Sequence, residues 1–136
     1  MDYIEGKLPE REAVRRLYDD AAGSLYLRHG RARARAARVA LPRLRYDGDT
    51  LCGLLRAVGD GQTILYIQDI LVLQQYRRHG IGRTMVKMLL DAYPNVRQRV
   101  LLTDETPEMH GFYESLGFFP SGQVGLTAFY YMGGES

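Results

Sequence analysis

Two segments of the chain carry residues whose types and spacing could do chemistry. In the first, residues 70–84, an apolar run leads into a basic turn with two glycines, and an amphipathic pattern of helical period follows. A strand, a glycine turn and a helix in this order point several backbone N–H groups and the positive end of a helix dipole at one place. Such a place binds phosphate, so the sequence predicts a phosphate site around Gly80 and Gly82.

Three glycine-loop patterns could describe this turn. A GxxxxGK[ST] loop needs a lysine and a hydroxyl group after its second glycine, and this turn does not place them correctly. A GxGxxG dinucleotide loop would need a third glycine where the chain has Met85, and an acidic residue closing the next strand. The remaining pattern is Arg/Gln-x-x-Gly-x-Gly/Ala, which Arg77, Gly80 and Gly82 match.

In this third pattern the chain resembles the GNAT superfamily of N-acetyltransferases, whose pyrophosphate loop for acetyl-coenzyme A has this form. The residues before the turn, Ile70 to Val72, look like the end of the family's fourth strand. The second segment, FYESLGF at 112–118, looks like the family's FYExLGF signature. The spacing between the segments fits one helix, one strand and the start of another helix. The resemblance covers roughly residues 46 to 132.

The resemblance implies a site for acetyl-coenzyme A as the cosubstrate. Glycines at 80 and 82 would let the backbone approach the pyrophosphate, and the Val72 N–H would polarise the thioester carbonyl. The family often has asparagine at 106, and Thr106 keeps a hydrogen-bonding group there. The residues assigned to the coenzyme are Leu71, Val72, Arg77, Arg78, His79, Gly80, Ile81, Gly82, Arg83, Thr84 and Thr106. For each arginine, a solvated basic loop is the alternative.

Tyr113 is the candidate general acid. It matches the family position that commonly protonates the departing coenzyme A thiolate, and a phenolate has a basicity similar to that of a thiolate, so a phenol can donate this proton. The alternative is a core aromatic with its hydroxyl at the surface.

Asp69 is the candidate general base. It alternates with Leu65, Ile67 and Leu71, and a carboxylate within an apolar face would have a raised pKa, which suits a base near neutral pH. The alternative is a strand-edge charge or an acid paired with an arginine. The other candidates for this step are Gln68 and Tyr66, which could orient a relay water, and the carboxylates Glu105 and Glu108.

The hydrophobic pattern around these residues predicts an α+β fold. Helices are expected at 10–18, 21–40, 83–93 and 107–116, and strands at 41–46, 50–58, 63–73, 99–103 and 125–132. One β-α-β crossover lies in the middle, so a mixed sheet covered by helices is expected. The resemblance refines this to a GNAT-like fold, with a mixed, mostly antiparallel central sheet of about six to seven strands and about four flanking helices.

The composition sets further limits. A chain of 136 residues has room for one core, so residues 1–136 are expected to form a single domain. No apolar run approaches the roughly 20 residues that span a bilayer, and a single cysteine, Cys52, suits a reducing cytoplasm. The three histidines and Cys52 show no spacing of metal ligands. A cytoplasmic protein without a membrane partner or a structural metal is therefore expected.

The segment 28–45 departs from the family. It carries seven arginines and no acidic residue, whereas the whole chain has a net charge of only +2. Three interpretations stay open: a solvated helix face followed by an edge strand that tolerates Pro42, an arginine patch for an acidic partner or nucleic acid, or a local reading of the gene in another frame.

The preferred hypothesis is an N-acetyltransferase that moves acetyl from acetyl-coenzyme A to a primary amine of a small molecule or peptide in a direct ternary complex. A non-catalytic acyl-coenzyme A sensor and a basic nucleic-acid-binding module that uses 28–45 are the alternatives, with nucleic acid the less favoured partner. The family also allows a homodimer.

Overall fold

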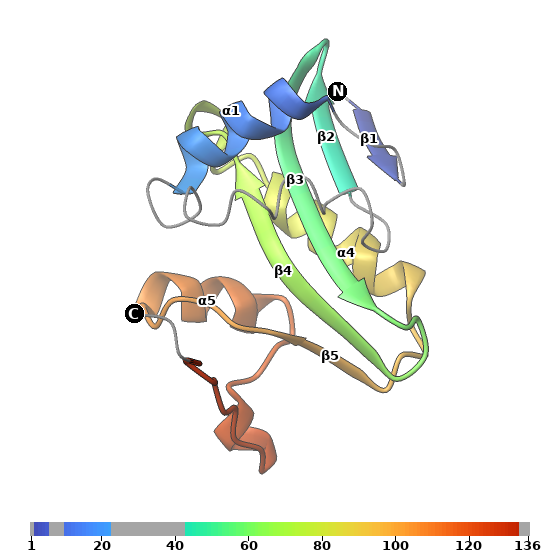
Figure 1. Ribbon diagram of the computed structural model, residues 1–136, viewed down its shortest axis with the longest axis vertical. Coiled ribbons are helices and arrows are strands. Elements are labelled where there is room, and N and C mark those ends of the chain that lie inside the picture. Colours follow the sequence, from blue (N-terminus) through green and yellow to red (C-terminus); the bar gives the residue numbers. More distant parts are fainter. Residues whose placement is uncertain (1, 6–9, 23–42, 134–136) are drawn as a thin grey trace. The chain divides into compact units, whose positions relative to one another are not determined.

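The computed structural model describes residues 2–5, 10–22 and 43–133. It contains two compact units, Met1–Leu102 and Thr103–Ser136. Among the described residues, the first unit holds a five-stranded sheet and two α-helices, and the second holds one α-helix and an extended C-terminal segment (Figure 1). Whether the whole chain folds as a single domain stays a prediction.

The sheet has the strand order β1-β2-β3-β4-β5. Its strands are β1 (Asp2–Glu5), β2 (Arg43–Asp47), β3 (Thr50–Gly59), β4 (Ile64–Val72) and β5 (Gln98–Leu101). The first four strands pair antiparallel, and β5 runs parallel to β4, so the sheet is mixed as predicted. Seven consecutive residues of β3, from 51 to 57, are buried, because helices cover both faces of this central strand.

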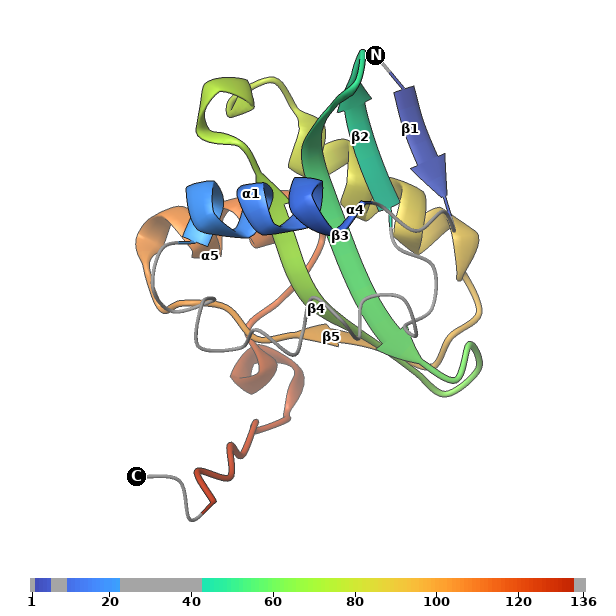
Figure 2. The same ribbon diagram turned by 45° about the horizontal axis from the view of Figure 1, so that its top comes forward.

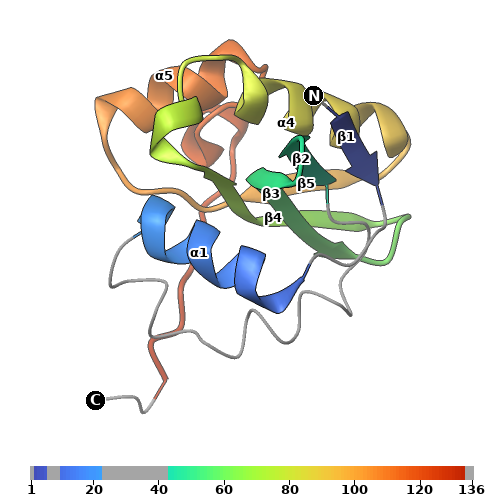
Figure 3. The ribbon, with the colours of Figure 1, turned by 90° about the horizontal axis from the view of Figure 1, so that it is seen from above.

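Two helices of the first unit cover opposite faces of the sheet (Figures 2 and 3). They are α1 (Arg11–Ala22), which contacts β3 and β4, and α4 (Ile81–Ala92), which contacts β2, β3 and β4. The inward side chains Leu17 of α1 and Met85 and Leu89 of α4 are fully buried. The crossover β4-α4-β5 returns the chain to the same sheet, as the sequence predicted.

Two tight turns set the register of the antiparallel strands. Gly48 has a φ of 60° in the β2–β3 turn, a backbone conformation that favours glycine. In the β3–β4 turn, the Oδ1 atom of Asp60 accepts hydrogen bonds from the N–H groups of Gln62 (2.8 Å) and Thr63 (2.7 Å). These hydrogen bonds hold the pKa of Asp60 well below its usual value, with the Thr63 hydroxyl making the largest contribution.

The second unit begins its helix as the sequence predicted. The helix α5 (Pro107–Ser115) has Pro107 in its first turn, and the Oγ1 atom of Thr106 accepts a hydrogen bond from the Met109 N–H at 3.1 Å. A short 3₁₀ turn, η3 (Ser121–Val124), follows. The strand expected at 125–132 is not formed: these residues are irregular and exposed, with Phe129 94% exposed.

Other expectations are not confirmed, are incomplete or lie outside the described residues. The described residues form five strands and three α-helices, so the expected six to seven strands and four helices are not confirmed. The strand β1 was not predicted, because a four-residue segment is too short to show a period of two. The helix expected at 21–40 lies outside the described residues, except that α1 includes 21 and 22.

Candidate active site

The glycine turn forms the connection from β4 to α4. After β4 the chain makes one 3₁₀ turn, η2 (Gln74–Tyr76), and α4 begins directly after Gly80. Gly80 is the N-cap of α4 in a left-handed conformation with a φ of 75°, and no side chain caps the helix there. No cap side chain therefore competes with a ligand at this end of α4, and a helix N-terminus is an arrangement that binds anions.

Hydrogen bonds within the turn hold its shape. The carbonyl of Gly80 accepts hydrogen bonds from the N–H (2.9 Å) and the hydroxyl (2.8 Å) of Thr84. The Nδ1 atom of His79 lies 2.9 Å from the Tyr76 carbonyl oxygen. Arg78 has a positive φ of 67°, which is unusual for a residue with a side chain. The predicted coenzyme residues 77–84 thus form one continuous, ordered turn.

The positive charge of the turn is accessible. Arg77, Arg78 and His79 are exposed, and Arg83 is half-buried in the first turn of α4. A Cβ atom on Gly80 would meet no protein atom within 4 Å, so the space beside the cap is open. By contrast Ile81, the next residue, is buried and anchors the start of α4 in the core. Open space, uncapped N–H groups and arginines together fit a pyrophosphate.

Backbone alternation directs the N–H of Val72 away from β3. Leu73 donates its N–H to the Cys52 carbonyl on β3 at 2.9 Å, and adjacent residues of a strand point their N–H groups to opposite sides. The Val72 N–H therefore points to the side of β4 on which β5 lies. Pairing with β5 ends at Ile67, so within the described sheet residues 68–72 have no strand partner on that side.

The last residue of β4 also contacts the turn. The Nε atom of Arg77 donates a hydrogen bond to the Val72 carbonyl at 3.4 Å. The neighbouring Leu71 points its side chain into the core, where it is buried. The structure therefore places Val72 beside the basic turn. By the same alternation the N–H of Leu71 is directed at β3, so its role toward the coenzyme stays a prediction.

Two residues from other parts of the first unit, Asp20 and Asp47, form hydrogen bonds with the turn that the sequence did not predict. Asp20 of α1 accepts the N–H of Gln74 at 2.8 Å, and its carbonyl accepts the Gln74 side-chain amide at 3.0 Å. Tyr76 donates its hydroxyl to Asp47 of the β2–β3 turn at 2.7 Å, and this hydrogen bond raises the pKa of Tyr76. Such contacts join residues 54 and 29 positions apart in the chain, so no local sequence pattern reveals them.

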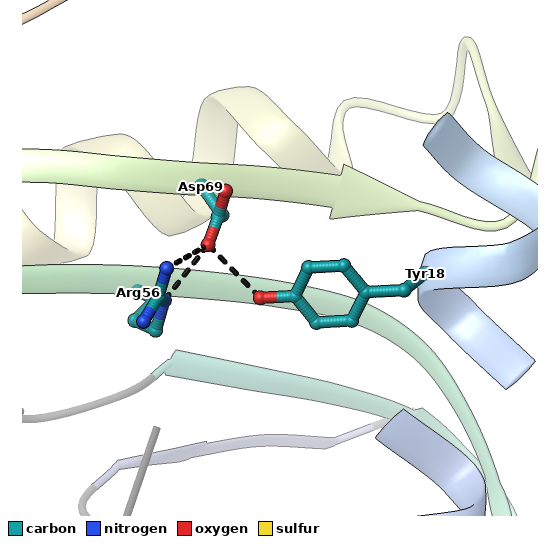
Figure 4. A network of polar contacts seen from close by, with 3 residues as sticks. All are labelled: Tyr18, Arg56 and Asp69. Atoms are coloured by element: carbon teal, nitrogen blue, oxygen red, sulfur yellow. Dashed lines mark hydrogen bonds and ion pairs between the residues drawn. The ribbon is translucent and has the colours of Figure 1, made fainter. Parts of the chain in front are cut away.

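Asp69 lies in a buried network on the face of the sheet that α1 covers (Figure 4). Its Oδ2 atom accepts hydrogen bonds from the Arg56 Nε (2.7 Å) and the Tyr18 hydroxyl (2.9 Å), and the Arg56 Nη2 is 2.6 Å away. The three residues are only 3%, 7% and 1% exposed. These contacts correspond to the alternative of an acid paired with an arginine. A role as general base stays a prediction.

A signal for this network was present in the sequence. Arg56 is the only charged residue in an otherwise apolar strand, and Asp69 is the only charged residue in the next strand. The hairpin register places the two directly opposite each other, because β4 has one extra residue between its partners of Arg56 and Ala57. That irregularity could not be read from the sequence, and a regular hairpin would pair these residues differently.

Tyr113 and Thr106 belong to the second unit. The ring of Tyr113 makes edge-to-face contacts with Phe112 (5.0 Å between centroids) and Phe118 (5.9 Å), and the residue is half-buried. Thr106 uses its hydroxyl to cap α5. Both predicted roles toward the coenzyme stay predictions.

The remaining candidates occupy varied places. Gln68 is exposed and Tyr66 half-buried on β4, while Glu105 and Glu108 are exposed around the start of α5. Cys52 is fully buried, and its burial raises the pKa of the thiol, so it has the character of a core residue.

Among the residues that the structure describes, no cluster of three or more His, Cys, Asp or Glu side chains could hold a metal ion. The same residues include no helix that is both long and apolar enough for a membrane span.

The sequence of the chain matches the family described as "Acetyltransferase (GNAT) family" over residues 6–118. The chain belongs to the GNAT acetyltransferase family. Among curated proteins, this GNAT protein is 38% identical over 68 residues to FG08082 of Gibberella zeae, whose name carries only a provisional assignment as an acetyltransferase. That stretch covers 48% of the chain and 37% of the relative's length.

Solved structures of GNAT proteins share the fold. The GNAT family acetyltransferase SP0256 from Streptococcus pneumoniae is 30% identical, with a TM-score of 0.85 over 98% of both chains. The aminoglycoside N-acetyltransferase AAC(6')-Iy, solved in complex with CoA, is 14% identical, with a TM-score of 0.68 over 96% of this chain and 97% of that chain. At this low identity, the second likeness shows the fold alone. Membership of the GNAT family supports acetyl transfer as the general class of reaction.

Proposed function

We propose that this GNAT protein is an N-acetyltransferase that transfers the acetyl group of acetyl-coenzyme A directly to a primary amine of a small molecule or peptide. The observation that carries the proposal is the end of β4. There the Val72 N–H points away from β3, and Arg77 contacts the Val72 carbonyl. The helix α4 begins directly after Gly80, which has a left-handed conformation and no side chain to cap the helix. The complex of AAC(6')-Iy with CoA adds support from the same fold.

The turn would hold the pyrophosphate of the cosubstrate. The N–H groups at the start of α4 and the guanidinium groups of Arg77, Arg78 and Arg83 supply hydrogen bonds and charge complementary to phosphate. Gly80 keeps the space beside the helix end open, because it has no side chain. The backbone of residues 68–72, which has no strand partner on its β5 side within the described sheet, offers hydrogen bonds to the amide-rich arm of the coenzyme.

Two groups would act on the reacting atoms. The Val72 N–H would donate a hydrogen bond to the thioester oxygen as negative charge develops there. The amine nitrogen forms a bond to the acetyl carbon, the carbon–sulfur bond breaks, and the Tyr113 hydroxyl would give its proton to the leaving sulfur. The proton that the amine loses returns to solvent directly or through a carboxylate. No covalent enzyme intermediate is required, which agrees with the burial of Cys52.

A binding measurement tests the first half of the proposal. The midpoint of thermal unfolding is measured with and without acetyl-coenzyme A, because a ligand at about 100 times its Kd stabilises the folded state by about 2.7 kcal/mol. Coenzyme A and ATP serve as comparison ligands. We expect acetyl-coenzyme A to raise the midpoint by several degrees, and an unchanged midpoint at millimolar ligand would contradict the proposal.

A transfer measurement tests the second half. Release of the coenzyme A thiol is followed with panels of aminoglycosides, polyamines and peptides with free N-termini, and acetylation of the amine nitrogen is confirmed by mass spectrometry. The bisubstrate analogue bound by AAC(6')-Iy, an acetylneamine derivative, makes aminoglycosides a reasonable first panel. Binding of acetyl-coenzyme A without transfer to any of these amines would favour the sensor alternative.

A further inference from the structure

The last turn of α1 contacts two parts of the candidate site. Tyr18 donates its hydroxyl to Asp69 on β4, and Asp20 binds Gln74, the residue that starts the turn toward Gly80. Tyr18 and Asp20 are two residues apart, so they lie within one helical turn of each other. A rigid segment of helix therefore links the buried Asp69 to the beginning of the phosphate-binding turn.

We propose that Asp69 is a positioning residue for this turn, which acts through Tyr18 and the end of α1. The proposal rests on the proposed function, since it assigns Asp69 to the binding of acetyl-coenzyme A rather than to removal of the proton from the amine. It extends the candidate site to two residues, Tyr18 and Asp20, that lie on the first helix of the chain.

The geometry of Asp69 suits a fixed acceptor. Its Oδ2 atom is directed at the Arg56 guanidinium and at the Tyr18 hydroxyl. The Arg56 guanidinium and the Tyr18 hydroxyl are both donors here, so this one oxygen atom accepts both contacts. Arg56 balances the buried charge, and breaking such a buried pair is costly. The carboxylate is therefore held in one place, and Tyr18 is held with it.

Through its contacts with Gln74, Asp20 fixes the start of the turn relative to the end of α1. Gln74 is exposed, and its N–H and its side-chain amide both bind Asp20. The N–H of Gln74 is directed at the Asp20 carboxylate, so its exchange with solvent reports on that one hydrogen bond. If the end of α1 moves, this hydrogen bond is lost first, and the start of the turn becomes free to move.

Amide hydrogen exchange at Gln74 tests the proposal without any ligand. We expect Asp20→Ala to speed exchange of the Gln74 N–H by about tenfold or more, and Tyr18→Phe to speed it by about threefold to tenfold. Two control substitutions remove the same kinds of group, a carboxylate and a tyrosine hydroxyl, from residues outside the Asp69 and Gln74 contacts. Asp19→Ala removes the neighbouring exposed carboxylate, which pairs with Arg15 at 3.7 Å, and Tyr93→Phe removes the hydroxyl of a half-buried tyrosine at the end of α4. Both controls should leave exchange at Gln74 unchanged.

Steady-state kinetics distinguishes positioning from catalysis. In Tyr18→Phe and Asp69→Asn we expect the KM for acetyl-coenzyme A to rise by about threefold to tenfold, the kcat to stay within about twofold, and the pH profile of kcat to keep its shape. Acetyl-coenzyme A binding by thermal shift should weaken in parallel.

The outcomes separate this proposal from the proposed function. Wild-type exchange at Gln74 in Tyr18→Phe would overturn the positioning role, whether or not the protein binds acetyl-coenzyme A. A kcat lowered by about a hundredfold in Asp69→Asn, with loss of the acidic limb of the pH profile, would overturn it in favour of a general base. If wild type fails to bind acetyl-coenzyme A, the proposed function fails, and the exchange result still decides whether Asp69 positions the turn. Tyr18→Phe keeps the test valid even if Asp69→Asn does not fold.

Discussion

Gly53 on β3 lies directly beneath Ile81, the first residue of α4. A Cβ atom at position 53 would be 2.9 Å from the Cγ2 atom of Ile81 and 3.3 Å from the Cε atom of Met85. The absence of a side chain at 53 therefore allows the N-terminal end of α4, and with it Gly80, to lie close to the sheet. Gly53, a residue of the core, thereby helps to set the location of the proposed pyrophosphate site.

Gly53→Ala should move that end of α4. The added methyl group must displace Ile81 and press on Arg45 and Met85. Overpacking of this kind typically costs about 1–3 kcal/mol of unfolding free energy. We expect a lower midpoint in urea unfolding together with weaker binding of acetyl-coenzyme A. Gly111→Ala is the control, because a Cβ there meets nothing within 4 Å, and alanine within a helix should stabilise the chain by about 0.5–1 kcal/mol. Undiminished affinity in a destabilised Gly53→Ala would disprove the link to the site.

Gly80→Ala should reduce coenzyme binding more than stability. Its φ of 75° imposes a strain of about 1–2 kcal/mol on alanine, and the new Cβ would occupy the open space where the pyrophosphate is proposed to lie. Gly48→Ala is a matched control: its φ is 60°, and a Cβ there also meets nothing within 4 Å. Both variants should lose similar stability in chemical unfolding. Only Gly80→Ala should raise the Kd of acetyl-coenzyme A, and equal affinities of the two variants would contradict the assigned site.

Tyr113→Phe should lower turnover without loss of binding. A general acid contributes about a hundredfold or more to the rate, while the phenyl ring keeps the edge-to-face contacts with Phe112 and Phe118. Steady-state kinetics with an identified amine gives the kcat, and thermal shift gives the affinity for acetyl-coenzyme A. Tyr130→Phe, which removes an exposed hydroxyl in the same unit, should behave as wild type. A kcat unchanged in Tyr113→Phe would show that another group protonates the thiolate.

The β3–β4 turn should lose stability in acid. Hydrogen bonds from Thr63, Gln62 and Ile64 hold the pKa of Asp60 below its usual value, which is about 3.9 in an unfolded chain. Asp60 therefore stabilises the folded state above about pH 4, and this contribution is lost as the pH falls below that value. The midpoint of thermal unfolding of wild type should exceed that of Asp60→Ala at pH 7, and the difference should shrink from about pH 4 downward. Thr63→Val should weaken this pH dependence, whereas a difference that is constant between pH 7 and pH 2 would refute it.

Cys52 should be unreactive in the native protein. Its side chain is fully buried, and burial raises the pKa of the thiol, so little thiolate is present at neutral pH. Ellman's reagent should modify it slowly in buffer and completely in guanidinium chloride. Acetyl transfer should survive Cys52→Ala, and rapid modification of the folded chain that also abolishes transfer would reopen the question of a covalent mechanism.

Several elements were predictable, because each depends on local patterns. The alternation of Leu65, Ile67, Asp69 and Leu71 appears as alternate burial along β4, and Pro107 marks the start of α5 as expected. Two failures have physical causes. A run of apolar residues at 125–132 has strand propensity, but a strand forms only where a neighbouring strand accepts its hydrogen bonds. The short β1 is formed by pairing with β2, more than 35 residues away in the chain.

The sequence by itself determined the family, the glycine turn and the helix that follows, since glycine spacing and hydrophobic period are properties of consecutive residues. Only the tertiary structure decided which residues contact the Asp69 carboxylate. Whether that carboxylate is an isolated acid in an apolar face or the partner of Arg56 and Tyr18 depends on a one-residue irregularity in a hairpin and on the docking of α1. Both are long-range events, governed by which surfaces become buried together, and the contact of Asp20 with Gln74 has the same origin.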